Sequence, residues 1–401
     1  MNKVTIQEEK TLNITTDNSI TSVNGVYESK GVTNNASNGA NKVNADDTAA
    51  ILTLSRNGDS DGVVNVKRTS SNFNLYASDI NNVQSILRTL GYYNGPNCGF
   101  VSDETRTAIR KFQKDYGMAE TGSLTENVYD RILTVDSLLK NKEMQTQLTK
   151  LGFYDGNKKH IFKALQNFQK LYGLTENGKY NSLTKVTLAK VTNEYDKLYN
   201  SSIMDDLEDN LCHYKIVDGK KVTDEIQKDA FVKVYVFLKH GMSLNVNQIA
   251  GVMGNLHAES AILADNVNDG AYSGEHNYKS GYKYNSGDYI AFGLLQWADP
   301  ARKAGLEAMA NAMAFGNSED EKTKALWDIN VQLAYFKQEM TTKMQNMTDY
   351  SKAWEELKRK YTYNEVSDYF LEKIESPDEW ELEKETRREH SKTIFEALKK
   401  L

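Results

Sequence analysis

Residues 254–260 read GNLHAES and place Glu259 at the end of an apolar helical segment. Asn245 or Asn247 is expected to cap the start of this helix, because a short polar side chain pairs with backbone N–H groups that otherwise lack partners. Apolar residues then follow at the i, i+3, i+4 and i+7 positions that face a protein core, namely Ile249, Val252, Met253 and Leu256. The pattern predicts a core helix that ends near Glu259.

Glu259 lies seven positions after Val252 and three after Leu256, at the edge of the apolar stripe. Partial burial favours the neutral form of a carboxyl group. A general acid needs that form near neutral pH if it is to protonate a glycosidic oxygen. The periodicity alone is equally compatible with a glutamate that is exposed at the helix end and has no chemical role.

A second short motif, GLLQW at residues 293–297, follows a segment rich in glycine, tyrosine and asparagine. We expect Gln296 and Trp297 to shape the floor and wall of a cleft and to contact substrate there. The alternatives are a Trp that packs at the end of a strand and a Gln that serves only in a local hydrogen bond. Arg302 and Glu339 fit either a structural ion pair or substrate binding.

Residues 231–340 resemble the phage tail lysozyme family, a branch of the lysozyme-like superfamily. The resemblance rests on residues 249–256 and 258–260, the 293–297 motif, residues 301–303 with Leu306, and Gln332 and Leu333 with Phe336 and Glu339. It implies a domain that cleaves the β-1,4 glycan strands of peptidoglycan, with Glu259 as the catalytic acid. We expect Ser260, beside it, to contact the substrate.

Glycosidases of this class usually pair the acid with a second carboxylate that acts as base or nucleophile. Four acidic residues lie between Glu259 and Trp297, namely Asp265, Asp269, Glu275 and Asp288. Asp288 stands just before the 293–297 motif, and we rank it first as the second catalytic carboxylate. Each of the four also fits a turn, where such side chains form local hydrogen bonds.

The same segment carries five tyrosines whose rings suit the apolar faces of sugars: Tyr272, Tyr278, Tyr282, Tyr284 and Tyr289. Tyr289, next to Asp288, is the one that we expect to contact substrate. The chain has 23 tyrosines in total, so the enrichment is a modest signal.

Two segments in the middle of the chain repeat each other. LGYYNG at residues 90–95 recurs as LGFYDG at 151–156, and FQKDYG at 112–117 recurs as FQKLYG at 168–173. The repeat indicates two copies of one small helical module. Both copies resemble the three-helix peptidoglycan-binding module that is often attached to wall-lytic enzymes. The second copy is five residues shorter between the two motifs, so it is the weaker candidate for wall binding, and the alternative for both copies is a pair of spacer bundles.

We predict a mainly α multidomain protein in which three-helix peptidoglycan-binding-like modules precede an α+β lysozyme-like domain. The expected segments are an Asn/Ser/Thr-rich N-terminal region (1–75), two modules (76–136 and 137–195), a linker (196–228) and the catalytic domain (229–401). In the N-terminal region, residues 4–6 with 12–14, and 51–54 with 63–66, alternate like paired strands, the second pair around a turn at 57–62. This small β element is either a dock onto a tail structure or a tether.

Composition excludes several other classes of protein. The net charge of −6 argues against a nucleic-acid-binding surface. No run approaches the ~20 apolar residues of a membrane span, and the N-terminus lacks the apolar core of a signal peptide. His257 and Glu259 have an H-x-E spacing without an HExxH motif or a Cys/His cluster, so we expect no metal and no cofactor. Cys98 and Cys212 fall in different predicted modules and do not indicate a disulfide.

These features predict a peptidoglycan hydrolase, either an endolysin or a tail-associated lysozyme, that acts at the bacterial cell wall with Glu259 as general acid. N-acetylmuramidase activity is favoured over N-acetylglucosaminidase activity. The alternatives are a lytic transglycosylase that uses Glu259 alone, a non-catalytic wall-binding tail or adhesion protein, and a host autolytic or spore-cortex enzyme. The expected partners are peptidoglycan glycan strands and components of a phage tail or tail-like particle. Without a signal peptide, we expect release through a lysis pore or carriage on such a particle.

Overall fold

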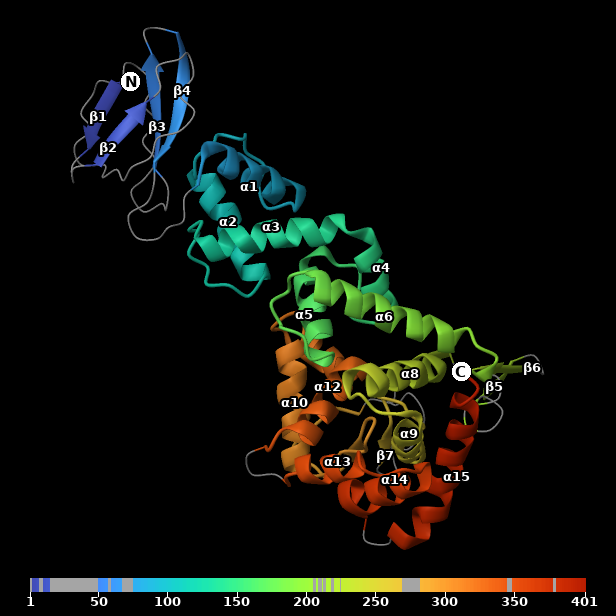
Figure 1. Cartoon of the computed structure of the whole chain (residues 1–401). Coiled ribbons are helices and arrows are strands. Elements are labelled where there is room, and N and C mark those ends of the chain that lie inside the picture. Colours follow the sequence, from blue (N-terminus) through green and yellow to red (C-terminus); the bar gives the residue numbers. More distant parts are fainter. Residues whose placement is uncertain are drawn as a thin grey trace. The chain divides into compact units, whose positions relative to one another are not determined.

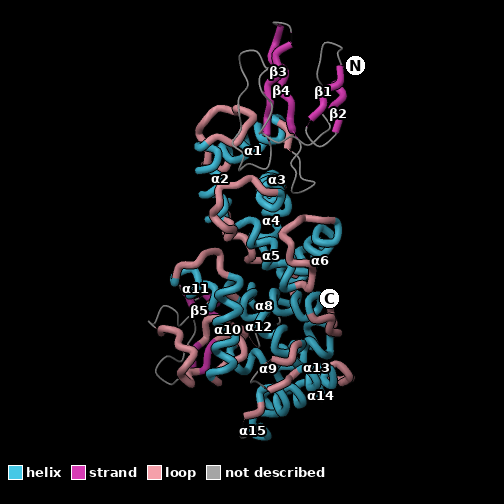
Figure 2. Tube along the Cα trace, turned by 90° about the vertical axis from the view of Figure 1, so that its left-hand side faces the viewer, coloured by secondary structure: helices cyan, strands magenta, loops and turns pink. Residues whose placement is uncertain are grey.

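The computed structural model is mainly helical (Figures 1 and 2). It describes four strands near the N-terminus and residues 75–401, except 205–206, 208–210, 212–213, 218–219, 224, 269–281, 345–347 and 378–379. The chain divides into two compact units, residues 1–141 and 142–401. No described helix has the length and apolar character needed to cross a membrane. The mainly α, multidomain fold class that the sequence predicts is confirmed.

The four N-terminal strands form two antiparallel hairpins. Strand β1 (Asn2–Ile6) pairs with β2 (Lys10–Ile14), and β3 (Ala50–Arg56) pairs with β4 (Asp59–Val66). The strands predicted at 4–6, 12–14, 51–54 and 63–66 all lie within these elements. The second hairpin is tighter than predicted, because β4 begins at Asp59 and only Asn57 and Gly58 separate the two strands. Asn-Gly is the pair that two-residue hairpin turns favour.

The first repeat forms three helices, α1 (Ala77–Thr89), α2 (Asp103–Asp115) and α3 (Glu126–Lys140). Ser102 caps α2 and Thr125 caps α3, each by accepting a hydrogen bond from a backbone N–H of the first turn. The helices share a core that includes Ile80, Val83, Leu87, Ile109 and Phe112, all buried. The small three-helix module that the internal repeat predicts is therefore present in the first repeat.

The second repeat has the same plan and belongs to the second compact unit. It consists of α4 (Lys142–Lys150), the short 3-10 helix η1 (Lys158–His160), α5 (Ile161–Leu171) and α6 (Ser182–Tyr199). Helix α5 packs against α12 (Ile329–Thr341), and α6 packs against α8 (Glu225–Val236). The second repeat is thus built onto the C-terminal part of the chain. Part of the predicted linker is also structured, since β5 (Tyr214–Val217) and β6 (Lys220–Thr223) form a hairpin there.

The C-terminal part is organised around α9 (Val246–Ser260), which packs against α14 (Tyr363–Phe370) and α15 (Trp380–Leu398). Its other elements are η2 (Phe237–Gly241), β7 (Val267–Asn268), β8 (Ala291–Phe292), α10 (Pro300–Met313), α11 (Glu319–Leu326), α13 (Ser351–Leu357) and η4 (Leu371–Glu375). Strands β7 and β8 pair antiparallel and form a minimal sheet. This layout places the end of α9 near the 293–297 motif.

Helix α9 is more deeply buried than its apolar stripe predicts. Every residue from Gln248 to Leu256 is buried, which is typical of a helix at the centre of a domain. Gly251 and Gly254 allow the close packing, because a Cβ atom at either position would clash with Val366 or Ser391. Asn245, one of the two predicted caps, closes the start of α9: its side chain accepts from the Gln248 N–H at 3.1 Å, and its own N–H donates to the Gln248 side chain at 3.0 Å.

Candidate active site

Glu259 lies in the last turn of α9, where the chain leaves the helix sharply. Ala261 and Ile262 both adopt positive φ angles, 54° and 59°, and direct the backbone away from the helix axis. The preceding Ser260 is fully buried, and its hydroxyl lies 3.1 Å from the Leu256 carbonyl and 2.9 Å from the Leu294 carbonyl. Ser260 therefore ties the end of α9 to the 293–297 motif, instead of facing a cleft as the sequence suggested.

A cleft of about 500 Å³ opens beside Glu259. Its described lining comes from the end of α9, the 293–297 motif, the start of α10, the segment before α13, and the turn after η4: Glu259, Leu295, Gln296, Ala298, Asp299, Ala301, Arg302, Thr348, Tyr350, Glu375 and Pro377. The structure therefore brings Glu259 and Gln296 together, as the two sequence motifs predict. Aliphatic, aromatic and charged groups share this lining, a mixture that suits a hydroxyl-rich sugar.

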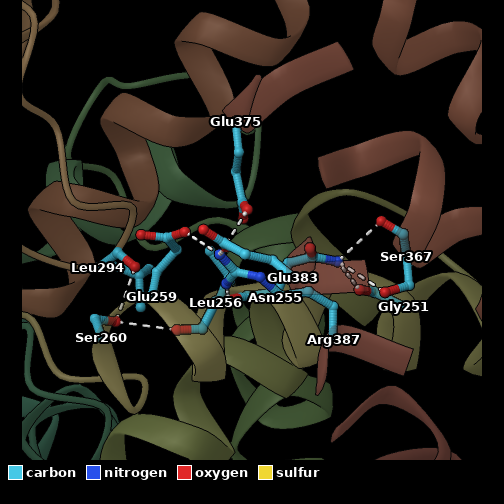
Figure 3. Close-up of polar contacts among 10 residues, drawn as sticks. All are labelled: Gly251, Asn255, Leu256, Glu259, Ser260, Leu294, Ser367, Glu375, Glu383 and Arg387. Carbon is cyan, nitrogen blue, oxygen red and sulfur yellow. Dashed lines mark hydrogen bonds and ion pairs between the residues drawn. The ribbon is translucent and has the colours of Figure 1, made fainter. Parts of the chain in front are cut away.

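Arg387, on α15, holds Glu259 in place (Figure 3). Its guanidinium donates to carboxylate oxygens of Glu259 and Glu383, and to the Asn255 backbone carbonyl at 2.9 Å. The Arg387 side chain is 5% exposed and that of Glu259 is 22% exposed. Glu259 is thus paired with an opposite charge as well as partly buried.

Glu375 is the third carboxyl group around this guanidinium, at 3.4 Å from its nearest nitrogen. It is the last residue of η4, and its side chain is 5% exposed. Burial raises the pKa of Glu375 well above its ordinary value; Arg387 opposes this effect, and the carboxylates of Glu259 and Glu383 add to it. In the part of the chain that the structure describes, no donor is bonded to either Glu375 oxygen.

Asp288, which the sequence ranks as the second carboxylate, does not line the described part of the cleft. It forms an ion pair with Lys303, whose side chain is fully buried, and it accepts from the Ile290 N–H at 3.0 Å. A buried lysine needs a counter-charge, and Asp288 supplies it. No local pattern indicates this ion pair, because nothing in the sequence around Lys303 shows that its side chain is buried.

None of the remaining predicted carboxylates and tyrosines that the structure describes lines the cleft. Asp265 does not line it, while Asp269 and Glu275 lie outside the described residues, as do Tyr272 and Tyr278. Tyr289 is 77% exposed on the surface. Tyr282 is buried, and Tyr284 donates from its hydroxyl to the Lys303 carbonyl at 2.6 Å.

Gln296 lines the cleft in an unusual backbone conformation, with φ of 46°. Its side-chain amide donates to the Gly293 carbonyl at 2.7 Å, which stabilises the tight turn of the 293–297 motif. Gly293 is required here, since its φ is 75° and a Cβ atom would meet the Gln332 side chain. Gln332 in turn accepts from the Leu294 N–H at 2.8 Å and so fixes the motif from behind.

Trp297 is fully buried behind the cleft, so the structure places its indole out of reach of a ligand there. The indole N–H donates to Glu339 at 2.9 Å, and Glu339 also accepts from the Arg302 guanidinium at 2.8 Å. Trp297 and Glu339 thereby orient Arg302, which does line the cleft and lies over the Tyr350 ring at 5.2 Å. The structural ion pair between Arg302 and Glu339, one of the two interpretations offered by the sequence, is therefore present. Its Arg302 also lines the cleft.

Three charged residues are absent from the sequence-based prediction: Glu375 and Asp299, which line the cleft, and Arg387, which contacts Glu259. Glu375 and Arg387 follow Glu259 by more than a hundred residues, and no local pattern marks them. Asp299 could have been found as an N-cap residue before Pro300, and it does accept from the N–H groups of Ala301 and Arg302 at 2.9 and 3.0 Å. Among the residues that the structure describes, no group of three or more His, Cys, Asp or Glu side chains is arranged to hold a metal ion.

Comparisons with known proteins agree with this arrangement at the level of family. No curated protein and no solved structure gives a significant match to the chain. Residues 76–132, which span α1, α2 and the first part of α3, match the family model of a peptidoglycan binding domain. Residues 230–398, which contain every described residue of the cleft, match the family model of phage tail lysozyme, and the two matches together identify a lysozyme-like protein that acts on peptidoglycan.

Proposed function

We propose that the chain cleaves the β-1,4 glycosidic bonds of peptidoglycan, with Glu259 as the general acid. The observation that carries the proposal is the position of Glu259: it is a partly exposed residue that lines a cleft of about 500 Å³, at the end of a helix that is buried from Gln248 to Leu256. The helix fixes the carboxyl, while the cleft admits a glycan strand. Arg302 and Gln296 supply donors along the same wall.

In this mechanism Glu259 gives its proton to the oxygen of the scissile glycosidic bond. The bond between that oxygen and the anomeric carbon breaks, its electron pair stays with the leaving oxygen, and an oxocarbenium-like centre forms on the sugar. A water molecule then adds to the anomeric carbon and returns a proton to Glu259. We propose hydrolysis after N-acetylmuramic acid as the first bond to test.

A lytic transglycosylase is the second candidate, and the surroundings of Asp288 favour it. Because Asp288 is engaged by the buried Lys303, it is poorly suited to activate a water molecule opposite Glu259. Without such a base, a hydroxyl group of the sugar itself attacks the anomeric carbon and leaves an anhydro-sugar end. Glu259 serves as acid and then as base in that route. Hydrolysis would instead require another carboxylate of the cleft to act as the base. Of the described carboxylates that line the cleft, Asp299 is the most exposed.

We further propose that the first repeat holds the enzyme on the wall, since it carries the match to a peptidoglycan binding domain. The second repeat is proposed to serve mainly as a packing unit for the catalytic part. Carriage on a phage tail or tail-like particle remains our proposal for delivery to the wall.

The test compares wild type with Glu259→Gln on purified Gram-positive cell walls, with released fragments identified by mass spectrometry. The substitution keeps the size of the side chain and removes the transferable proton. We expect wild type to solubilise the walls and the variant to lose at least about a hundredfold in rate, the usual effect of removing a general acid. Reducing ends on the products indicate hydrolysis and name the bond, whereas anhydro ends indicate the transglycosylase.

Equal clearing by both proteins would show that Glu259 is not the acid. If neither protein releases fragments while both sediment with the walls, the chain is a wall-binding protein without turnover. Thermal unfolding of the variant serves as the control for folding, because a misfolded variant would also be inactive.

A further inference from the structure

We propose that Glu375 stores the proton that Glu259 uses, and delivers it across a hydrogen bond between the two carboxyl groups. This inference rests on the proposed function of Glu259. In this arrangement the resting site holds Glu259 as a carboxylate bonded to Arg387, and Glu375 as a neutral acid beside it. Glu375 is thus a positioning residue that acts through Glu259.

The charges around Arg387 require at least one proton. One guanidinium faces three carboxyl groups, those of Glu259, Glu375 and Glu383, so full ionisation would leave a net charge of +1 − 3 = −2 in this cluster. The guanidinium and the Glu375 side chain are each 5% exposed, so solvent screens this charge poorly. Two carboxylates that share a site rarely both ionise. A single bound proton reduces the net charge to −1.

Burial decides which carboxyl group keeps that proton. The Glu383 side chain is 46% exposed and the Glu259 side chain 22% exposed, whereas the Glu375 side chain is 5% exposed. Both also accept a hydrogen bond from the Arg387 guanidinium, while Glu375 lies only within ion-pair distance of it. Glu375 therefore has the least support for a negative charge.

A neutral Glu375 also accounts for the lack of hydrogen-bond donors around its carboxyl group among the residues that the structure describes. Both Glu375 oxygens are buried, and no donor is bonded to either of them in the described part of the chain. Glu259 and Glu375 both lie within ion-pair distance of the same Arg387 nitrogen, Nη2, and Figure 3 shows the two side chains meeting at this guanidinium. Two carboxylates cannot form a hydrogen bond, but a carboxylic acid can donate to a carboxylate.

The backbone holds Glu375 in this position. Residues Leu371–Glu375 form a π-helical turn, and Ser376 closes it with φ of 51° and a hydrogen bond from its N–H to the Leu371 carbonyl at 2.8 Å. Short π-helical segments occur frequently at functional sites. Glu375 also lines the cleft, and its two carboxyl oxygens are buried beside the Arg387 guanidinium.

The proton transfers balance over one reaction cycle. Glu375 gives its proton to Glu259, and Glu259 passes that proton to the leaving oxygen as the glycosidic bond breaks. Glu375 and Glu259 are then both carboxylates, and the oxocarbenium-like centre carries the positive charge. When water or a sugar hydroxyl adds to the anomeric carbon, the proton that it releases returns through Glu259 to Glu375. Among the residues that the structure describes, the other charged or titratable groups that pair with these two side chains or line the same cleft are Arg387 and Glu383 from α15, Asp299 and Arg302 at the start of α10, and Tyr350 before α13.

The experiment compares the pH dependence of wall cleavage in wild type, Glu375→Gln and Glu372→Gln. Glu372 lies in the same π-helical turn and pairs with Lys373 on the surface, so it is the matched control for the substitution. We expect Glu375→Gln to lose about tenfold to a hundredfold in kcat with little change in KM, and to lose its activity on the alkaline side at a lower pH than wild type. Glu372→Gln is expected to keep the wild-type rate and pH profile.

A second measurement does not depend on the folding of a variant. In wild-type protein labelled with ¹³C at glutamate side chains, we expect one carboxyl resonance that stays protonated at neutral pH, and that is missing in Glu375→Gln. If every glutamate of the wild type is ionised at neutral pH, the proposal is overturned. It is also overturned if Glu375→Gln folds and keeps the wild-type kcat and pH profile.

The result for Glu259→Gln separates this proposal from the proposed function. If Glu259→Gln is inactive and Glu375→Gln behaves like wild type, Glu259 is the acid without a stored proton. If Glu259→Gln remains fully active, the proposed function fails, whatever Glu375 does.

Discussion

The two repeats have nearly the same core and different surroundings. In the first, the Phe112 ring meets Tyr92 edge-on at 5.8 Å and lies against Tyr116 at 4.4 Å. In the second, Phe168 meets Phe153 edge-on at 5.5 Å and lies against Tyr172 at 4.8 Å. A buried glutamine also repeats: Gln113 accepts from the Gly122 N–H and Gln169 from the Gly178 N–H, both at 2.8 Å. The repeated sequence motifs therefore encode the inside of the module.

The outer face of the second repeat has changed along with its packing. The Tyr92 hydroxyl donates to Asp115 at 2.8 Å in the first repeat, whereas the matching positions of the second hold Phe153 and Leu171, both buried. Asn167 replaces the exposed Lys111, and its amide donates to the Met313 carbonyl at 2.8 Å. Helix α5 therefore has neither the aspartate nor the exposed lysine of the matching helix α2, and it packs against α12.

The shortened loop of the second repeat takes part in the same packing. Its His160 ring bonds to Asp155 at 2.8 Å and stacks on Phe315 at 4.5 Å, with the two rings nearly parallel. From the catalytic side, the Asn330 amide donates to the Leu151 carbonyl at 3.0 Å and Lys337 donates to the Leu171 carbonyl at 2.8 Å. The second repeat is therefore packed onto the C-terminal part through both its loop and its helices.

The largest expected effect comes from removing the core ring of each repeat. Phe112→Ala and Phe168→Ala each delete a fully buried aromatic side chain, and each should cost about 3–5 kcal/mol in the free energy of unfolding. Calorimetry should resolve two transitions, one for each compact unit. We expect Phe112→Ala to lower the first unit's transition only, and Phe168→Ala to lower the transition of the catalytic unit. If both variants lowered the same transition, the two repeats would not belong to separate folding units, and the comparison would be wrong.

A smaller effect is expected from the contact that distinguishes the two outer faces. Asn167→Ala leaves the Met313 carbonyl buried without its donor, which should cost about 1–3 kcal/mol in the catalytic unit. Lys111→Ala, at the matching position, changes an exposed residue and should stay within about 0.5 kcal/mol. Chemical denaturation of both variants checks the pair. Equal costs would mean that the second repeat does not depend on this face for its stability.

The smallest expected effect is a difference in pH dependence between the two units. Residues 1–141 contain no histidine, while His240, on η2, lies 3.9 Å from Glu194 on α6, where the second repeat meets the catalytic part. Burial lowers the pKa of His240 below its ordinary 6.5, and Lys190 adds to this effect. The unfolded chain therefore binds a proton more readily than the folded one, so the contribution of His240 is fully present above pH 6.5 and is lost as the pH falls through its lowered value.

This effect is measured as the stability of wild type minus that of His240→Gln, at pH values from about 7.5 down to about 5. The subtraction cancels other titrating groups, including Glu375, whose raised pKa acts in the opposite direction. We expect the difference to decline as the pH falls from 6.5 through the lowered pKa of His240. A constant difference, or one that grows towards acid, would be inconsistent with a neutral His240.

The fold and the position of Glu259 at the end of a core helix were predictable from sequence because both depend on local patterns. The stripe on α9, its Asn245 cap and the position of Glu259 at its end all follow from spacing within one helix. The repeats were visible for the same reason. Each of these features is settled by residues that are near one another in the chain.

The partners of Glu259 were not predictable, because they are set by packing between distant helices. Arg387 reaches Glu259 only because Gly254 lets α15 approach α9 closely. Asp288 has the residue type and spacing of a catalytic base, yet the buried Lys303 engages it. Trp297 belongs to a cleft motif and is nevertheless fully buried, since its indole is used to hold Glu339.

The contact between Arg387 and Glu259 also has a consequence for biosynthesis. The two residues are 128 positions apart in the chain. At typical elongation rates of about 5–20 residues per second, a ribosome that has just added Glu259 needs roughly 6–26 s more to add Arg387. During that interval α9 is present without the arginine that anchors its glutamate. A nascent chain would therefore gain its complete site only after α15 has emerged, so that the wall-degrading activity we propose would arise last.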